Sequence, residues 1–366
     1  MGNTSVKPLN SRNYGIDLLR IISMLMIVTL HVLGQGGILK STIPMSTNYE
    51  VAWFLEMLCY GAVNCYGLIS GYVGCNSKFK YSNIVYLWLQ VAFYAVLISG
   101  ATALLKDYGV RQHFFDGFMP VWNDYYWYFT AYFCMFFFIP VLNKILNSLN
   151  DKQLKVLALS IFLLFSFMPN FAEKDLFFTN RGYSAIWLTL LYLLGGIIKK
   201  CNLLSKIKPW ILAFLYFLFS FITWLEKYIV QSHNIELSGS ETVWTCHLFS
   251  YTSPTVLLGS IMLLIMFSKI NIGKITSKII AFFAPLSFSV YLIHVHRCFW
   301  KYIMAQRFVD FATFSPFKMI IAVIISSISI YLFCVAIDFI REKIFSLLKI
   351  KKGLNYLENK FLGDIW

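Results

Sequence analysis

The chain has 366 residues, of which 58% are hydrophobic and only 13% are charged. Soluble domains usually hold about 45–50% apolar and about 25% charged residues, so the composition excludes an ordinary soluble protein and predicts an integral membrane protein. A net charge of +14 would suggest nucleic-acid binding in a soluble chain. Here basic cytoplasmic loops explain it better, and we expect no nucleic-acid partner.

Ten apolar segments suit helices that cross a bilayer. They cover residues 14–33, 51–73, 83–105, 124–142, 156–172, 184–198, 209–229, 248–268, 279–298 and 317–340. The sequence therefore predicts an all-α polytopic membrane protein with about ten transmembrane helices. Lysine and arginine concentrate in alternate connecting segments, which places both the N- and C-termini in the cytoplasm.

The first segment carries Asp17, Arg20 and His31 within its apolar run. Ionisable groups in lipid are costly unless they are paired or face a polar cavity, so they indicate function. Arg20 and His31 share one helix face about 16 Å apart along the axis, and Asp17 lies within ion-pair reach of Arg20. This predicts a polar stripe through most of the membrane. Alternatively, Asp17 and Arg20 form a structural ion pair near the membrane surface and His31 only ends the helix.

Polar groups in later segments gather at the two membrane faces. With this topology Glu56, His247 and His294 lie at the outer level with His31, whereas Lys78 and Lys80 face the cytoplasm. The outer half would thus hold candidate acid–base groups and the inner mouth would be basic.

We expect Asn64 to need a hydrogen-bond partner in mid-membrane, and the pairs Ser70-Gly71 and Gly195-Gly196 to allow close helix packing.

Four motifs, in order along the chain, resemble those of the membrane acyltransferase 3 family. They are Asp17-Leu-Leu-Arg20 followed by His31, Leu68-Ile-Ser70-Gly71-Tyr72, Trp127-Tyr128 with Pro140-Val-Leu-Asn143, and Ser287-Phe-Ser-Val-Tyr291-Leu-Ile-His294. Members of this family O-acylate bacterial surface glycans and some other acceptors. The resemblance implies a protein of the cell (inner) membrane, with an acyl-CoA donor, most simply acetyl-CoA, as co-substrate and no permanently bound cofactor.

The resemblance and the topology together suggest roles for the site residues. His31 would be the catalytic base for an attacking hydroxyl, or would itself carry the acyl group. Arg20 would contact the donor on the cytoplasmic side, together with Lys78 and Lys80. Many family members have an Arg-x-x-Arg in that loop, and here the two lysines offer charge without the bidentate arginine fork.

Other residues complete the expected site. Glu56 is a candidate catalytic residue that could orient a histidine. His294 is a further candidate catalytic residue, although a histidine at a helix end is often only an interfacial group with a hydrogen bond. Trp127, Tyr128 and Tyr291 are candidates to bind the acceptor sugar, although Trp127 and Tyr128 suit an interfacial aromatic belt equally well. We expect no metal site. Polar groups of the outer loops could also meet the acceptor, although solvated loop residues would look the same; they are His113, Asp116, Asp124, Glu173, Asp175, Arg181 and His233.

The C-terminal stretch differs from the rest. Apolar and basic residues alternate from residue 343 onward, which suits a helix lying on the anionic inner leaflet. We therefore divide the chain into a transmembrane acyltransferase domain, 1–342, and a basic amphipathic cytoplasmic tail, 343–366, in contact with membrane lipids.

The leading hypothesis is a transmembrane O-acyltransferase that moves an acyl group, most simply acetyl, from cytoplasmic acyl-CoA to a hydroxyl of a cell-surface polysaccharide, glycolipid or lipid-linked sugar. The main alternative is a transporter or flippase for a polar solute or lipid-linked sugar, in which the same stripe is a substrate or proton path. A third is a relative that has lost catalysis and serves as a membrane partner subunit. Ester formation with consumption of the donor distinguishes the first from the others.

Overall fold

The computed structural model describes residues 12–104, 117–172, 174–243 and 246–363, and these residues form helices and connections without a strand. The longer helices are α1 (Tyr14–Leu33), α3 (Thr47–Tyr60), α4 (Ala62–Gly74), α5 (Tyr81–Leu104), α7 (Trp127–Ser148), α8 (Asp151–Ile161), α9 (Ala185–Lys200), α10 (Pro209–Ser238), α11 (Pro254–Ser268), α12 (Lys274–His294), α14 (Pro316–Leu347) and α15 (Ile350–Phe361). Short elements join them: α2 (Ile38–Ser41), η1 (Phe162–Phe167), η2 (Met168–Phe171), η3 (Asn180–Gly182), α13 (Arg297–Phe299), η4 (Trp300–Met304) and η5 (Val309–Thr313).

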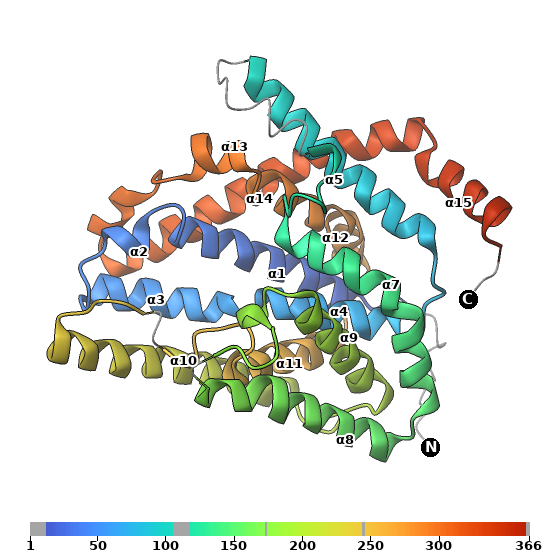
Figure 1. Cartoon of the computed structure of the whole chain (residues 1–366). Coiled ribbons are helices and arrows are strands. Elements are labelled where there is room, and N and C mark those ends of the chain that lie inside the picture. The colour runs from blue at the N-terminus through green and yellow to red at the C-terminus, as the bar shows by residue number, and fades with distance from the viewer. Residues whose placement is uncertain (1–11, 105–116, 173, 244–245, 364–366) are drawn as a thin grey trace.

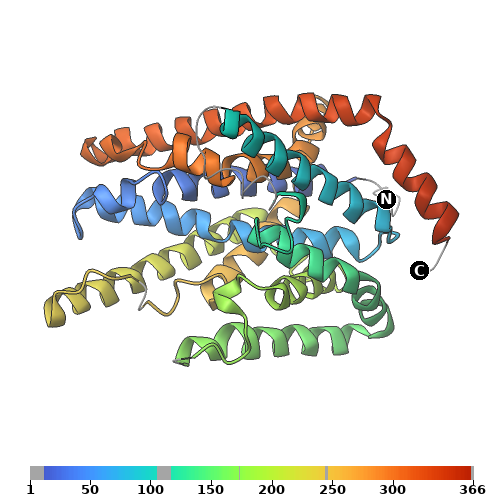
Figure 2. The ribbon, with the colours of Figure 1, turned by 45° about the horizontal axis from the view of Figure 1, so that its top comes forward.

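The helices confirm an all-α polytopic membrane protein. Within the described residues, eight helical stretches are long and apolar enough to cross a membrane, with α3 and α4 forming one of them and α8, η1 and η2 another. All ten expected segments overlap a helix, but α9 has 16 residues and α11 has 15, so the number of spans stays a prediction. The start of α1 and helix α15 lie toward the same end of the bundle (Figures 1 and 2).

Helix α1 lies inside the bundle, with α14 on one side and α10 and α8 toward the other (Figures 1 and 2). It packs against α3, α4, α11, α12 and α14. Asn13 caps its first turn by accepting hydrogen bonds from the N–H groups of Gly15 and Ile16, and its Nδ2 donates to the Ser268 carbonyl at the end of α11. The helix that carries the predicted polar stripe is therefore held in place along its length.

Helices α4 and α9 touch backbone to backbone, as the glycine pairs predict. A Cβ on Gly71 would lie 1.8 Å from the Tyr192 carbonyl oxygen, and one on Gly195 would lie 2.0 Å from that of Leu68. Only glycine allows this approach, and transmembrane helices commonly use small residues in this way. The contact fixes the position of α4 against α9.

Asn64 has the partners that the sequence required. Its side chain is fully buried; Nδ2 donates to the Tyr251 carbonyl at 2.7 Å, and Oδ1 accepts from Trp187 Nε1 at 2.9 Å. A buried amide without such bonds would cost about 1–3 kcal/mol for each group left unpaired. Asn64 thus links α4 to α9 and to the segment that precedes α11.

The C-terminal helices differ in part from the expected tail. Helix α14 continues past residue 342 to Leu347, so no break in the chain marks the proposed domain boundary. Helix α15 then contacts the start of α5, where the Glu358 carboxylate accepts a hydrogen bond from the Tyr81 N–H at 2.6 Å and Asn355 bonds Ser82. The tail is therefore attached to the bundle through α5. Its location on an inner leaflet stays a prediction.

Candidate functional site

Two histidines from opposite ends of the sequence meet at the site. His31 lies in the last turn of α1 and His294 ends α12. His31 Nδ1 lies 2.8 Å from His294 Nε2, and His294 Nδ1 lies 2.5 Å from the Val290 carbonyl oxygen. His294 is fully buried, whereas His31 is partly exposed.

The partners assign the tautomers of both rings. A carbonyl oxygen only accepts, so His294 Nδ1 carries the proton and its Nε2 is an acceptor in the neutral ring. His31 must then donate from Nδ1, which leaves the lone pair of a neutral His31 on Nε2. The pair thus presents one defined nitrogen of His31 as a base.

A cavity of about 230 Å³ lies beside His31. Aromatic side chains dominate its wall: Tyr66, Trp127, Tyr128, Tyr183, Tyr251, Phe288, Tyr291 and Trp300. The Trp127 and Tyr183 rings lie 4.5 Å apart between centroids, and the Trp300 ring stands edge-on to His31 at 5.3 Å. Three of the sequence candidates for substrate binding therefore surround the predicted base.

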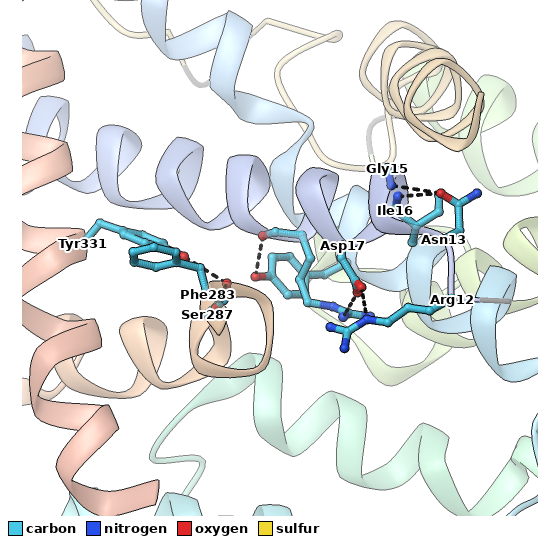
Figure 3. Close-up of polar contacts among 10 residues, drawn as sticks. Arg12, Asn13, Gly15, Ile16, Asp17, Phe283, Ser287 and Tyr331 are labelled. Atoms are coloured by element: carbon cyan, nitrogen blue, oxygen red, sulfur yellow. Dashed lines mark hydrogen bonds and ion pairs between the residues drawn. The ribbon is translucent and has the colours of Figure 1, made fainter. Parts of the chain in front are cut away.

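Charged residues at the start of α1 form a cluster around Asp17 (Figure 3). Arg20 Nη1 lies 2.9 Å from one oxygen of the Asp17 carboxylate, and Arg12 Nε lies 2.5 Å from the other. The Asp17–Arg20 ion pair is thus confirmed, and Arg12 is a third member that the sequence analysis did not place there. The Tyr66 hydroxyl donates to the Arg20 carbonyl at 2.9 Å while its ring lines the His31 cavity. Tyr66 therefore connects the charged cluster to the cavity.

The structure does not bring every predicted residue into the site. Among the described contacts, Glu56 makes no hydrogen bond to either histidine, and its buried Oε2 has no partner at all. His294 makes the orienting contact instead. His247 lies elsewhere, with its backbone N–H donating to Glu226 Oε1 at 2.9 Å. Lys78 and Lys80 are exposed in the connection between α4 and α5.

His247 faces a second, polar cavity of about 450 Å³, which Asp175 and Arg181 also line. Burial would raise the pKa of the Asp175 carboxyl, but hydrogen bonds from the Asn180 and Thr179 N–H groups outweigh burial and hold that pKa below its usual range. The Tyr251 N–H donates to the Arg181 carbonyl at 3.1 Å, so the two cavities share a wall. Of the other outer-loop candidates, Asp124 and His233 line neither cavity. His113, Asp116 and Glu173 lie outside the described residues.

Trp300, Tyr183 and Tyr251 line the His31 cavity but did not stand out in the sequence. They come from the short element η4 and from irregular connections, where no helical period assigns a side chain to a face. Aromatic residues are frequent in this chain, with 18% of the total, so their presence alone carries no signal.

Fold and site together define a polytopic helical membrane protein with a buried histidine pair next to an aromatic cavity. A family model described as an acyltransferase domain, that of the acyltransferase 3 family, matches residues 13–339. The chain belongs to this family and is a membrane acyltransferase. No curated protein and no solved structure matches it.

Proposed function

We propose that the protein is an O-acetyltransferase of the cell membrane. It would take acetyl from acetyl-CoA, or the acyl group of another acyl-CoA, on the cytoplasmic side and transfer it to a hydroxyl of a surface glycan or lipid-linked sugar. The observation that carries the proposal is the His31–His294 pair, because it leaves a defined lone pair on His31 beside a cavity in an acyltransferase chain.

In this reaction His31 acts as general base. The acceptor oxygen attacks the thioester carbonyl carbon while its proton passes to His31 Nε2, a step to which a positioned base contributes about 10²–10⁴-fold. Expulsion of the thiol breaks the C–S bond, and the thiolate takes the proton back from His31. The products are the ester and free CoA. His294 is a positioning residue that keeps His31 in the productive tautomer.

The charged end of α1 supports a donor site at the opposite side from the acceptor. CoA carries several phosphates, and Arg20 with Lys78 and Lys80 would attract them to the basic end of the bundle. Asp17 holds Arg20 from within α1. The pantetheine arm would then extend past Tyr66 to bring the thioester to His31.

The proposal is tested in cells that carry the wild-type chain, the His31→Ala chain or neither, at matched membrane expression. We expect ester-linked acetate on surface glycan with the wild type only. Equal acetate in all three would count against the proposal, and uptake and lipid-flipping assays would then examine the transporter alternative.

A further inference from the structure

Two buried hydrogen-bond donors in the His31 cavity have no acceptor. Within the described part of the chain, the Tyr291 hydroxyl and the Trp300 Nε1–H are inaccessible to solvent and donate no hydrogen bond. The Tyr128 backbone N–H is a hydrogen-bond donor to the Tyr291 oxygen, which leaves the hydroxyl proton without an acceptor. Both side chains line the cavity of His31. Buried polar groups are normally paired, and leaving one unpaired costs about 1–3 kcal/mol, so two such donors in one cavity need an explanation.

Neighbouring phenols show that this situation is specific. The Tyr66 hydroxyl bonds the Arg20 carbonyl at 2.9 Å, and the Tyr183 hydroxyl bonds that of Tyr251 at 3.3 Å. These rings line the same cavity, yet their polar atoms already have partners. Tyr291 and Trp300 therefore each keep a donor that no protein group uses.

Their positions place them around the base. Tyr291 lies one helical turn before His294 on α12, so both residues lie on one face. The Trp300 ring meets the His31 ring edge-on at 5.3 Å between centroids, and the Tyr291 ring lies 6.2 Å from that of Tyr128. Tyr291, Trp300 and His31 thus line one cavity, and His294 lies behind His31 on the face of α12 that carries Tyr291.

We infer that the Tyr291 hydroxyl and the Trp300 indole N–H form the oxyanion hole of the acyl-transfer site, an inference that rests on the proposed function. When the acceptor oxygen bonds to the thioester carbon, the C=O electron pair moves onto oxygen. Both donors then hydrogen-bond this oxyanion. When the C–S bond breaks, the pair returns to form the ester C=O, and the thiolate leaves with the proton from His31. No further reactant is needed.

Such donors act mainly in the transition state. They carry no partner to be displaced when the thioester binds, and they lie in an apolar wall where their dipoles are worth more than in water. Removing one oxyanion-hole donor typically lowers kcat by about 10²–10³-fold. We therefore expect a loss of turnover with little change in donor KM.

The test uses the purified full-length chain in lipid nanodiscs with acetyl-CoA and with surface glycan isolated from cells that lack the chain. Thiol release and ester formation are followed for the wild type, Tyr291→Phe, Trp300→Phe and the double variant. The matched control is Tyr331→Phe, which removes an equally buried hydroxyl that bonds Ser287 one helical turn before Tyr291 and that does not line the cavity. Replacement of the Trp300 indole by benzothiophene removes the N–H without changing ring size.

We expect each donor variant to lose about 10²-fold in kcat at unchanged donor KM, while Tyr331→Phe keeps its turnover. Full activity of both Tyr291→Phe and the benzothiophene variant would overturn the inference. Activity lost only in proportion to folded protein, as judged by thermal unfolding, would overturn it as well. If the wild type itself releases no thiol and forms no ester, the proposed function is wrong as well. If the wild type does both in a His31-dependent manner, the proposed function stands and the variants test only the oxyanion hole.

Discussion

His31 and His294 are 263 residues apart in the chain, yet His31 Nδ1 lies 2.8 Å from His294 Nε2. The contact joins the end of α1 to the end of α12, and the bond from His294 Nδ1 to the Val290 carbonyl fixes its direction. The second histidine thus takes the place that a carboxylate often fills beside a catalytic imidazole.

This relationship predicts a graded response at position 294. His294→Ala removes the acceptor for His31 Nδ1–H, so His31 loses its fixed tautomer; we expect kcat to fall about 10²-fold, at the low end for general-base effects. His294→Gln supplies a carbonyl oxygen that can accept the same hydrogen bond and should restore part of the rate. Turnover of acetyl-CoA by the two variants checks this. Equal rates for Ala and Gln would show that His294 acts only by filling space.

The basic end of the bundle should govern donor affinity. We expect Lys78→Ala with Lys80→Ala to raise the KM for acetyl-CoA more than it lowers kcat, because the lysines would attract phosphates far from the reacting carbonyl. The effect should shrink at high salt, since exposed charges are screened. The control is Lys206→Ala with Lys208→Ala, another exposed lysine pair between helices. The same KM as wild type in the first variant would remove these lysines from the donor site.

The glycine contact between α4 and α9 predicts a large loss of stability. Gly71→Ala places a Cβ 1.8 Å from the Tyr192 carbonyl oxygen, so the helices must move apart; overpacking of this kind costs about 1–3 kcal/mol or more. Thermal unfolding in detergent should show a lower Tm and a smaller yield. Gly353→Ala is the control, because nothing lies within 4 Å of its Cβ, and it should unfold at or above the wild-type temperature. An unchanged Tm for Gly71→Ala would contradict the packing described.

Asn64 offers a test that links stability to the site. Asn64→Leu leaves the Trp187 N–H and the Tyr251 carbonyl unpaired in the protein interior, which should cost about 1–3 kcal/mol for each group. Because Tyr251 lines the His31 cavity, we expect lower acyl transfer in the folded fraction as well. Thermal unfolding and specific activity per folded protein measure the two effects separately. A stable, fully active variant would show that these hydrogen bonds contribute little to stability or to acyl transfer.

The sequence predicted the polar residues of α1 better than it predicted the partner of His31. Asp17, Arg20 and His31 were predictable because ionisable residues are rare in apolar segments, and the helical period put Arg20 and His31 on one face. The partner of His31 was not predictable in this way. Glu56 and His294 were both candidates at the outer level, and only the packing of α1 against α12 decides which one makes the contact.

The aromatic wall and the span boundaries were harder to predict for a related reason. Trp300 lies in η4, and Tyr251 lies in a connection whose conformation depends on bonds to Asn64 and Arg181. Local sequence does not encode such long-range partners. Helix α14 runs to Leu347 without a change in backbone conformation, although basic residues begin earlier and suggested an end near residue 340.

The central claim is that His31 drives transfer of an acyl group from CoA to a glycan hydroxyl. The most direct measurement follows CoA thiol and ester-linked acetate together, with wild-type and His31→Ala chains in nanodiscs supplied with acetyl-CoA and glycan from cells that lack the chain. We predict that thiol and ester form in equal amounts with the wild type and that both disappear with His31→Ala. Ester formation that survives His31→Ala, or a folded wild-type chain that forms neither product, would contradict the account.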